Sequence, residues 1–348
     1  MTLPVSGPMQ ASMVNVELRR ADTNTLTMNE TPVRTLAAKP TGIISLNDFY
    51  GKTNRVPVTI TISANTTNYI LDPINIPEYI MGKTDVTIVV NSGIYLYSIL
   101  VDSPALSIKG WNTGDTVTII NNGYIIGMGG SGYKFGGGTA GSVGSYGGNA
   151  ISIYPQMTIF ITNNSYIAGG GGSGGGNIAG GGAGGGNGSD GLSLNSGGLG
   201  GGPGLAGSNG VTQGGGSPTF PAYIRLGTGG GGGRILPGVG GAGGVSNISA
   251  DMVGKGGGAG GGAGWWVRPN IPAGGGSAGA GGSANNPGVN TSGTGAGSGG
   301  GGGWGSSGGI GGIISSTPYA GGIGGKAIDL QGSTVVLTVP GTIYGAVS

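Results

Sequence analysis

The stretch AGGGAGGGNGSDG, residues 179–191, has eight glycines in thirteen positions. Glycine loses more conformational freedom on folding than any other residue, so a segment this rich in glycine is expensive to order. It either stays disordered or is held by something other than side-chain packing. Which of the two applies decides the fold of much of the chain.

Glycine is concentrated in one part of the sequence. The chain has 348 residues and 91 glycines, but only six of them lie in the first 110 residues. Within 168–325, runs such as GGGGSGGG alternate with compact apolar segments such as SPTFPAYIRL and WWVRPNIP. A plain flexible linker is one interpretation, although linkers seldom carry such large apolar groups. Collagen is excluded, because the runs hold consecutive glycines without a strict period of three.

The ordered alternative is a bundle of polyglycine-II helices. Such a helix has three residues per turn and no internal hydrogen bonds, so its N–H and C=O groups point outward and can bond to neighbours on every side. Inter-helix bonding would then offset the cost of ordering. A run of eight to ten residues would span about 25–30 Å. The segments between the runs become the turns at the two ends of the bundle.

A repeat flanks the glycine. Three related pentapeptides occur, each followed by a strand, an Asn- or Gly-containing turn and a second strand: PALSI at 104–108, NAISI at 149–153 and KAIDL at 326–330. Such recurrence predicts the rungs of a β-solenoid or a layered sheet. The glycine then forms insertions at about 127–148 and 168–325. The chain should return from the second insertion so that its last strands pair near 151–167.

The first 55 residues predict a small helical module. Met9, Met13 and Val16 are spaced as on an amphipathic helix, and a second helix with Thr31 as N-cap should run to Pro40. In the stretch 43–52, the apolar residues could close a miniature core: Ile44, Leu46, Phe49 and Tyr50. The expected fold is therefore mainly β plus polyglycine-II. We divide it into an N-terminal module (1–55), a β-strand repeat (56–167), a polyglycine-II bundle (168–325) and returning strands (326–348).

Composition excludes several functions. The net charge is +2, and the 14 basic residues are dispersed, which argues against nucleic-acid binding. Histidine and cysteine are absent, and the acids beyond residue 140 are only Asp190, Asp251 and Asp329. We therefore expect no enzyme, cofactor or metal site. No 18-residue apolar run occurs, so neither membrane insertion nor a signal peptide is expected. G-x-G-x-x-G recurs, but no copy follows a strand and opens a helix.

Aromatic and arginine side chains stand out in the segments between glycine runs. Either they cap the ends of the bundle, or they are exposed contact residues, since Trp, Tyr and Arg dominate binding hot spots. The candidates are Phe220, Tyr223, Arg225, Trp265, Trp266, Arg268, Trp304 and Tyr319.

The glycine runs with short apolar loops, GGGGSGGGNIAGGGAGGGNG and WWVRPNIPAGGG, resemble the receptor-binding adhesins at the tips of long tail fibres in T-even-like phages. The opening SGPMQASMVNVELRR and IISLNDFYGK resemble the N-terminal module of tailed-phage tail proteins. The resemblance implies a virion protein whose loops contact a bacterial surface receptor, either protein or glycan. It also implies attachment to other tail or fibre proteins through the N-terminal module. Candidates for that attachment are Met13, Val16, Arg19, Arg20, Phe49 and Tyr50.

Two alternatives remain at this point. A purely structural tail component would have the same bundle without a receptor. A glycine-rich ice-binding protein also uses polyglycine-II helices, but a flat regular face and cysteines would be expected, and this chain has no cysteine.

Overall fold

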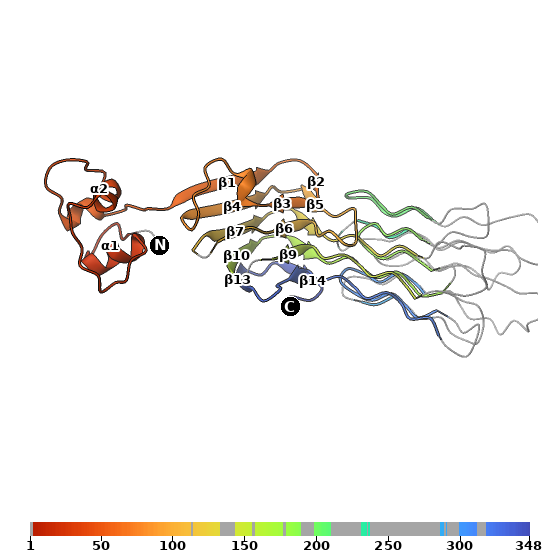
Figure 1. Cartoon of the computed structure of the whole chain (residues 1–348). Helices are drawn as coiled ribbons and strands as arrows, with labels where there is room; N and C mark the ends of the chain where they lie inside the picture. The colour runs from red at the N-terminus through yellow and green to blue at the C-terminus, as the bar shows by residue number, and fades with distance from the viewer. Residues whose placement is uncertain are drawn as a thin grey trace, which may run out of the picture.

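The chain is elongated, with two helices at one end, β sheets in the middle and glycine segments at the other end (Figure 1). The computed structural model describes residues 3–112, 114–132, 143–154, 157–176, 179–188, 198–209, 231–234, 236, 286–288, 290, 299–311 and 318–348. In this part of the chain no helix has the length and apolarity needed to cross a bilayer.

The N-terminal part has two α-helices, α1 (Ala11–Glu17) and α2 (Thr31–Ala37), and a 3₁₀ turn, η1 (Leu46–Phe49). Both helices were predicted, but Glu30 occupies the N-cap position of α2 and Thr31 is its first helical residue. The helix ends before Pro40 because Ala38 adopts a left-handed conformation, with φ of 54°. The two helices and the 3₁₀ turn pack together around a separate hydrophobic core, which is formed by Leu3, Val14, Val33, Leu36, Ala37, Ile44 and Phe49.

Phe49 was expected to take part in attachment, and this expectation is wrong. Its side chain is fully buried in the core of the N-terminal part, so it has no surface to offer a partner. An aromatic ring in a module this small is needed inside, because few other residues can fill the core.

Parallel strands form three sheets. The first sheet contains β1 (Val56–Ile62), β4 (Thr84–Val90), β7 (Thr116–Asn121), β10 (Thr158–Asn163) and β13 (Thr334–Val339). The second contains β2 (Thr66–Thr67), β5 (Tyr95–Tyr97), β8 (Tyr124–Ile126), β11 (Tyr166–Ala168) and β14 (Thr342–Tyr344). The third contains β3 (Tyr69–Leu71), β6 (Leu106–Ile108), β9 (Ile151–Ile153) and β12 (Ile328–Asp329). A second 3₁₀ turn, η2 (Pro73–Asn75), follows β3.

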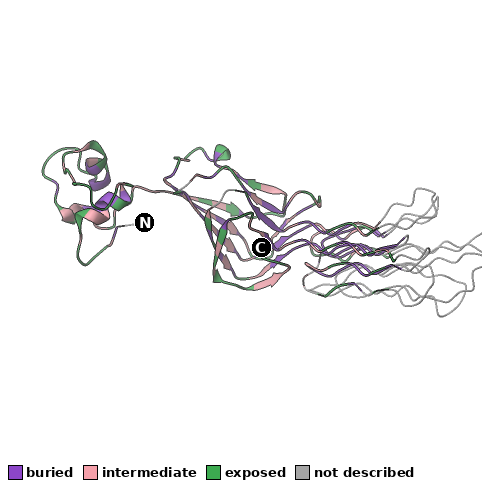
Figure 2. Cartoon of the chain, turned by 60° about the horizontal axis from the view of Figure 1, so that its bottom comes forward, coloured by how far each residue is buried: buried purple, intermediate pink, exposed green. Residues whose placement is uncertain are grey.

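Successive strands enter the first, second and third sheets in that repeating order, which is the arrangement of a three-sided β-solenoid; the first two sheets have five strands each and the third has four. The last turn pairs in parallel with the turn before the long glycine insertion: β12 with β9, β13 with β10, and β14 with β11. The predicted return of the chain after residue 325 is therefore confirmed. Along β4 and β7, buried residues alternate with more exposed ones, as expected for strands with one face inward (Figure 2).

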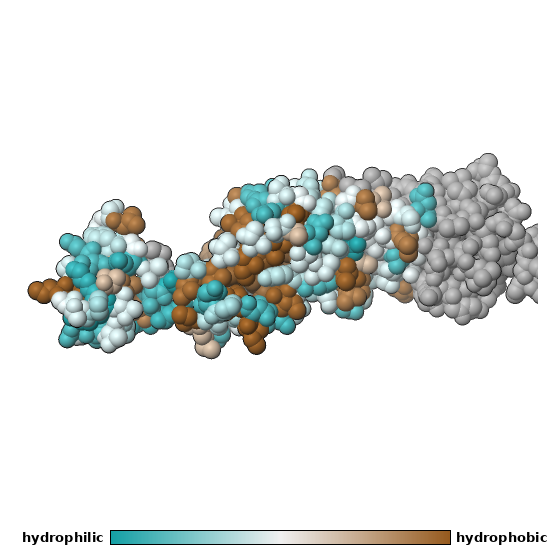
Figure 3. All heavy atoms as spheres, turned by 90° about the horizontal axis from the view of Figure 1, so that it is seen from above, coloured by the Kyte–Doolittle hydropathy of each residue, from teal (hydrophilic) through white to brown (hydrophobic). Residues whose placement is uncertain are grey.

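The two edges of the first sheet are blunted. β1 carries Pro57, which cannot donate a hydrogen bond to a further strand, and β13 has a register shift opposite Ile161 and Thr162. Apolar atoms lie on the outer surface of the sheet region in the view from above (Figure 3), and exposed apolar side chains occur in the connection between β3 and β4. These include Ile74, with 86% of its surface exposed, and Met81, with 69%.

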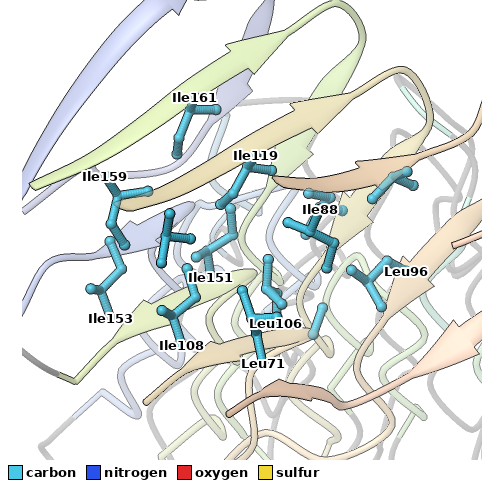
Figure 4. Close-up of a cluster of buried hydrophobic side chains, with 14 of the residues drawn as sticks. Leu71, Ile88, Leu96, Leu106, Ile108, Ile119, Ile151, Ile153, Ile159 and Ile161 are labelled. Carbon is cyan, nitrogen blue, oxygen red and sulfur yellow. The ribbon is translucent and has the colours of Figure 1, made fainter. Parts of the chain in front are cut away.

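The solenoid interior is filled by stacked aliphatic side chains from all three sheets (Figure 4). Ile88, Ile119 and Ile161 occupy equivalent positions on neighbouring strands and are fully buried. Polar groups inside are bonded: Asn121 Nδ2 donates to Asn163 Oδ1 at 2.8 Å, and Asn163 Nδ2 donates to the Pro340 carbonyl at 2.9 Å. The stacking fixes successive turns in register and makes the sheets a firm base for the insertions.

Arg55 links the N-terminal part to the sheets. Its side chain, only 8% exposed, donates from Nε to Asp85 at 2.9 Å, and from Nη2 to the Thr84 carbonyl and the Thr116 hydroxyl, both at 3.0 Å. One guanidinium thus joins the starts of β1, β4 and β7. Glu17 on α1 accepts from the backbone of Asn54 at 2.7 Å, which ties the helix to the same connection.

Candidate functional site

Both glycine insertions leave the solenoid at the same place. The first follows β8 and the second follows β11, two neighbouring strands of the second sheet. The strand pairing continues directly into the glycine: Gly127 N donates to Ala168 O at 2.8 Å, and Gly169 N donates to Tyr344 O at 2.9 Å. Sheet and glycine segments therefore share one uninterrupted hydrogen-bond network, and the segments extend from this edge (Figure 1).

Trp304 lies at the junction of sheet and glycine. Its side chain has no exposed surface and packs in a buried cluster with Ile126, Ala168 and Ala183. The expectation that Trp304 is an exposed contact residue is therefore wrong; of the two interpretations drawn from the sequence, the capping one holds here. The tryptophan fills the space where the glycine segments, which have no side chains, meet the end of the sheet.

Tyrosines of the second sheet form a stacked ladder beside this cluster. The rings of Tyr95 and Tyr124 lie 4.4 Å apart, those of Tyr124 and Tyr166 5.8 Å, and those of Tyr166 and Tyr344 6.1 Å, all within 28° of parallel. Burial raises the pKa of both Tyr95 and Tyr344. Sequence reasoning missed this ladder, although a tyrosine recurs in every copy of the repeat.

Arg234 is buried at the same junction, with 7% of its surface exposed. Its guanidinium donates to Gly201 O at 2.9 Å and to Ser98 O at 3.0 Å, and it lies 4.9 Å from the centre of the Tyr97 ring. Burial lowers the pKa of Arg234. The residue joins a glycine segment to the solenoid through two carbonyls and an aromatic face, a role for which its sequence context gives no signal.

The glycine segments are held together by their backbones. In the segment 169–176, consecutive N–H groups point to three different neighbouring segments, and every third donor returns to the same neighbour. Gly170 N and Ser173 N donate to the carbonyls of Gly148 and Ser145 in one neighbouring segment. Gly171 N and Gly174 N donate to those of Ala183 and Gly180 in a second, and Gly172 N and Gly175 N to those of Ser306 and Gly309 in a third; all six distances are 2.8 to 3.0 Å. The backbone thus has a period of three residues.

Approach between these segments is too close for side chains. A Cβ atom added to Gly170, Gly172 or Gly182 would overlap a backbone oxygen of the next segment. The glycine segments 169–176 and 179–186 are accordingly buried although they carry almost no apolar side chains (Figure 2). Hydrogen bonding, with very little side-chain packing, holds this part of the molecule, in contrast to the solenoid.

The segments run alternately away from the sheets and back. Near the sheets the chain reverses at Gly184, which lies beside Gly127, at Gly204, which lies beside Tyr95, and at Gly305, which lies beside Gly345. Gly204 and Gly305 have φ of 70° and 64°, a conformation that favours glycine.

At the far end, Gly311 N donates to Tyr319 O at 2.7 Å and Gly231 N to Ser208 O at 3.0 Å. Gly311 and Tyr319 therefore lie side by side, as do Ser208 and Gly231, so the chain comes back to its own neighbour in both places. Tyr319 is half-buried at this end. Phe220, Tyr223, Arg225, Trp265, Trp266 and Arg268 lie outside the described residues.

Attachment candidates of the N-terminal part differ in surroundings. Val16 is 43% exposed on α1, and Met13 packs against the core of this part. Arg20 pairs with Glu30 at 2.5 Å, and its hydrogen bond lowers the pKa of that carboxyl. Arg19 donates to Gly114 O and Tyr50 to Gly7 O. Both of these polar side chains are thus engaged within the chain.

Among the described residues, no group of three or more acidic side chains could hold a metal ion. The described structure consists of a solenoid that serves as a rigid base and of glycine segments, nearly without side chains, that extend away from it.

A family model described as phage tail fibre adhesin Gp38 matches residues 57–348. This chain belongs to that family. The Gp38 match begins within β1, so it includes the solenoid and the glycine segments and leaves out the two helices. It confirms the prediction of a phage tail fibre adhesin, and the family is a family of adhesins and not an enzyme family.

Among solved structures, this Gp38 family member is similar to a chain of the gp37–gp38 adhesin tip complex of the bacteriophage S16 long tail fibre. The two share 20% sequence identity with a TM-score of 0.41, and the alignment covers 98% of this chain and 99% of the other. No curated protein matches the sequence.

Proposed function

We propose that this adhesin contacts the bacterial surface through loops at the end of the glycine segments remote from the sheets. The observation that carries the proposal is the alternating course of the segments. The reversals beside the solenoid, at Gly184, Gly204 and Gly305, are short, whereas the residues that flank the longer connections lie on the far side. Chemical variety in this part of the chain lies in those connections, because the segments themselves are nearly bare backbone.

The glycine segments are, in our proposal, a bundle of polyglycine-II helices. The three-residue period of the N–H groups in 169–176 supports this, because a polyglycine-II helix has three residues per turn and bonds only to its neighbours. The close approach at Gly172 and Gly182 supports it as well. Such a bundle is stiff without needing apolar burial, and it holds its loops in fixed positions.

The contact loops we propose are 217–226, 265–272 and 313–320. They contain Phe220, Tyr223 and Arg225, then Trp265, Trp266 and Arg268, and finally Tyr319. Aromatic and arginine side chains give large contact area and directional hydrogen bonds to a protein, and their flat faces also stack on sugars. An outer-membrane protein and a surface glycan are both suitable receptors.

The N-terminal helices attach the adhesin to the tail or fibre in this proposal, and so place it on the virion. Two observations support it. The helices lie at the opposite end of the molecule from the described glycine segments (Figure 1), and they lie outside the family match, as an exchangeable attachment module would. Met13, Val16, Arg19, Arg20 and Tyr50 remain the candidate residues, while Phe49 is buried.

Binding of the purified full chain to whole host cells tests the loops. We expect the variant with Trp265→Ala and Trp266→Ala together to lose at least about tenfold in affinity, since truncating a hot-spot aromatic typically has that effect. Phe160→Ala is the matched control, because it truncates an aromatic side chain, 38% exposed, on the solenoid. Circular dichroism checks that each variant folds.

Equal binding by the double variant and the wild type would remove these tryptophans from the contact surface. If neither protein bound cells while both were folded, the proposal of receptor contact would fail and a structural role would take its place. Thermal hysteresis of the wild type would be needed to revive the ice-binding alternative.

A further inference from the structure

A polar groove of about 340 Å³ lies on the outer face of the third sheet, on the side of the solenoid and away from the proposed contact loops. Strand residues supply its floor: Ser152 on β9 pairs directly with Asp329 on β12, and Tyr154 points to the same face because it lies two residues after Ser152. Its walls come from Asp102 and from Tyr146, which belongs to the glycine segment 143–148. The volume is at the lower end of that of small-molecule sites.

The polar groups on the floor are held in fixed orientations. Asn149 accepts from the backbone N–H of Lys326 at 2.9 Å and donates to Asp329 at 3.2 Å. Lys326 Nζ lies 2.8 Å from the other carboxylate oxygen of Asp329. Gln331 donates to Asp329 at 3.1 Å. Such a network presents preset donors and acceptors and needs no rearrangement to bind a ligand.

Backbone strain occurs at the rim of the groove. Gln331 has φ of 45°, a conformation that an L-residue other than glycine, asparagine or aspartate rarely adopts. The glycine that follows it has φ of 84°. A tight turn here could use asparagine or glycine at both positions; the strained glutamine instead places its amide beside Asp329. Strain of this kind clusters at binding sites.

Two tyrosines line the groove and are open to solvent. Tyr154 is 48% exposed and Tyr146 is 51% exposed, while the Tyr146 hydroxyl donates to Asp102. That hydrogen bond raises the pKa of Tyr146. A half-exposed aromatic ring beside fixed carboxylate and amide groups is complementary to a pyranose, which has an apolar face of C–H groups and a rim of hydroxyls.

Charge narrows the ligand class. Asp329 is paired with Lys326, and Asp102 leaves the groove with a net negative charge. A phosphorylated or carboxylated sugar would meet repulsion, and a divalent cation would find too few acidic ligands. We infer that this groove, lined by Tyr146, Tyr154, Asp102 and Asp329, is a lateral binding site for a neutral saccharide. It is separate from the proposed contact loops and would hold the adhesin against surface glycan while those loops engage their receptor.

Saturation-transfer NMR on the full chain tests the site. The probes are methyl α-glucopyranoside, methyl α-mannopyranoside, methyl β-galactopyranoside and methyl β-N-acetylglucosaminide, with glucose 6-phosphate as the anionic control. We expect millimolar binding of at least one neutral glycoside and none of glucose 6-phosphate. Tyr154→Ala should weaken that binding about tenfold, since it removes the aromatic ring from the floor of the groove. Asp102→Asn, which keeps the shape of the groove, should weaken it as well.

Phe160→Ala serves as the control, because Phe160 is an exposed aromatic on another sheet. The double variant of Trp265 and Trp266 must retain the signal, which separates this site from the loops. The inference is overturned if no neutral glycoside gives transfer to the wild type. It is equally overturned if Tyr154→Ala and Asp102→Asn both keep full transfer, or if the loop variant abolishes it.

Discussion

At the scale of single residues, the glycine segments reverse the usual logic of a protein interior. In the solenoid, Ile119 and Ile161 stabilise the fold by what their side chains contact. In the glycine segments, Gly182 stabilises it by having no side chain, because the carbonyl oxygen of Gly171 lies where a Cβ atom would be. The tightest positions are therefore the ones where the smallest possible substitution has the largest effect.

Gly182→Ala should lower the free energy of unfolding by about 3 kcal/mol or more, since a methyl group pressed against backbone forces neighbouring segments apart. Gly202→Ala is the matched control. A Cβ atom there would lie 3.6 Å from the Leu205 side chain, which is ordinary contact, and the change should stay within about 0.5 kcal/mol. Thermal melting of the full chain distinguishes the two. Equal melting temperatures would mean that the segments are not packed backbone to backbone.

At the scale of elements, the rungs of the solenoid were predictable and the way they join the glycine was not. Strands recur with the same side chains at the same spacing, so the pairing of β12 with β9 could be read from the related pentapeptides. Trp304 carries no such signal. A reversal lies near the sheets or far from them according to how many glycine segments precede it along the chain. The glycine runs are irregular, so the number of segments cannot be counted from the sequence.

The N-terminal helices show a similar division. Apolar spacing located α1 and α2, because periodicity reflects the buried face. The stretch 43–52 offered Phe49 both as a core residue and as an attachment residue, and only the packing of the whole module shows that it belongs to the core. The contact loops could be proposed from composition alone, because aromatic and arginine side chains are conspicuous among glycines. The lateral groove could not, since its residues come from three stretches of chain that are distant in sequence: 101–104, 146–154 and 329–331.

The connection between helices and sheets should depend on pH through Asp85. Burial opposes its ionisation, but hydrogen bonds from Arg55 and Thr116 outweigh burial, so the pKa of Asp85 lies below the ordinary carboxyl value. Stability from the pair is therefore complete above the unfolded-state pKa of about 4 and is lost as pH falls through the lowered value.

Asp85→Asn should reduce stability at pH 7 by roughly 1 kcal/mol, a small effect because the carboxylate is 39% exposed and screened by solvent. The loss should shrink as the pH falls below about 4, where the wild type also loses the interaction. Melting curves across this range measure both effects. Asp22→Asn, at an exposed carboxylate of the N-terminal part, is the control. A difference between Asp85→Asn and wild type that stayed constant down to pH 2 would contradict the assigned ion pair.

At the scale of the whole molecule, three kinds of stabilisation follow one another along its length: a small apolar core, a stacked solenoid and a backbone-bonded bundle. Only narrow connections join the first to the second, mainly through Glu17, Arg19 and Arg55. The second and third share one hydrogen-bond network and one buried cluster around Trp304. Attachment should therefore be separable from adhesion, whereas the sheets and the glycine segments should unfold as one cooperative unit.

A chain that begins at residue 53 tests this division. It keeps Arg55 and every strand, so we expect it to fold and to bind host cells with unchanged affinity, while failing to join fibres from virions that lack their adhesin. Val16→Glu in the full chain is the companion variant, because it places a charge on an exposed apolar position of α1 without touching the core. It should keep cell binding and lose most fibre binding, measured by co-sedimentation with purified virions. Fibre binding by the shortened chain at full strength would move the attachment surface to the solenoid, where Ile74 and Met81 expose apolar side chains.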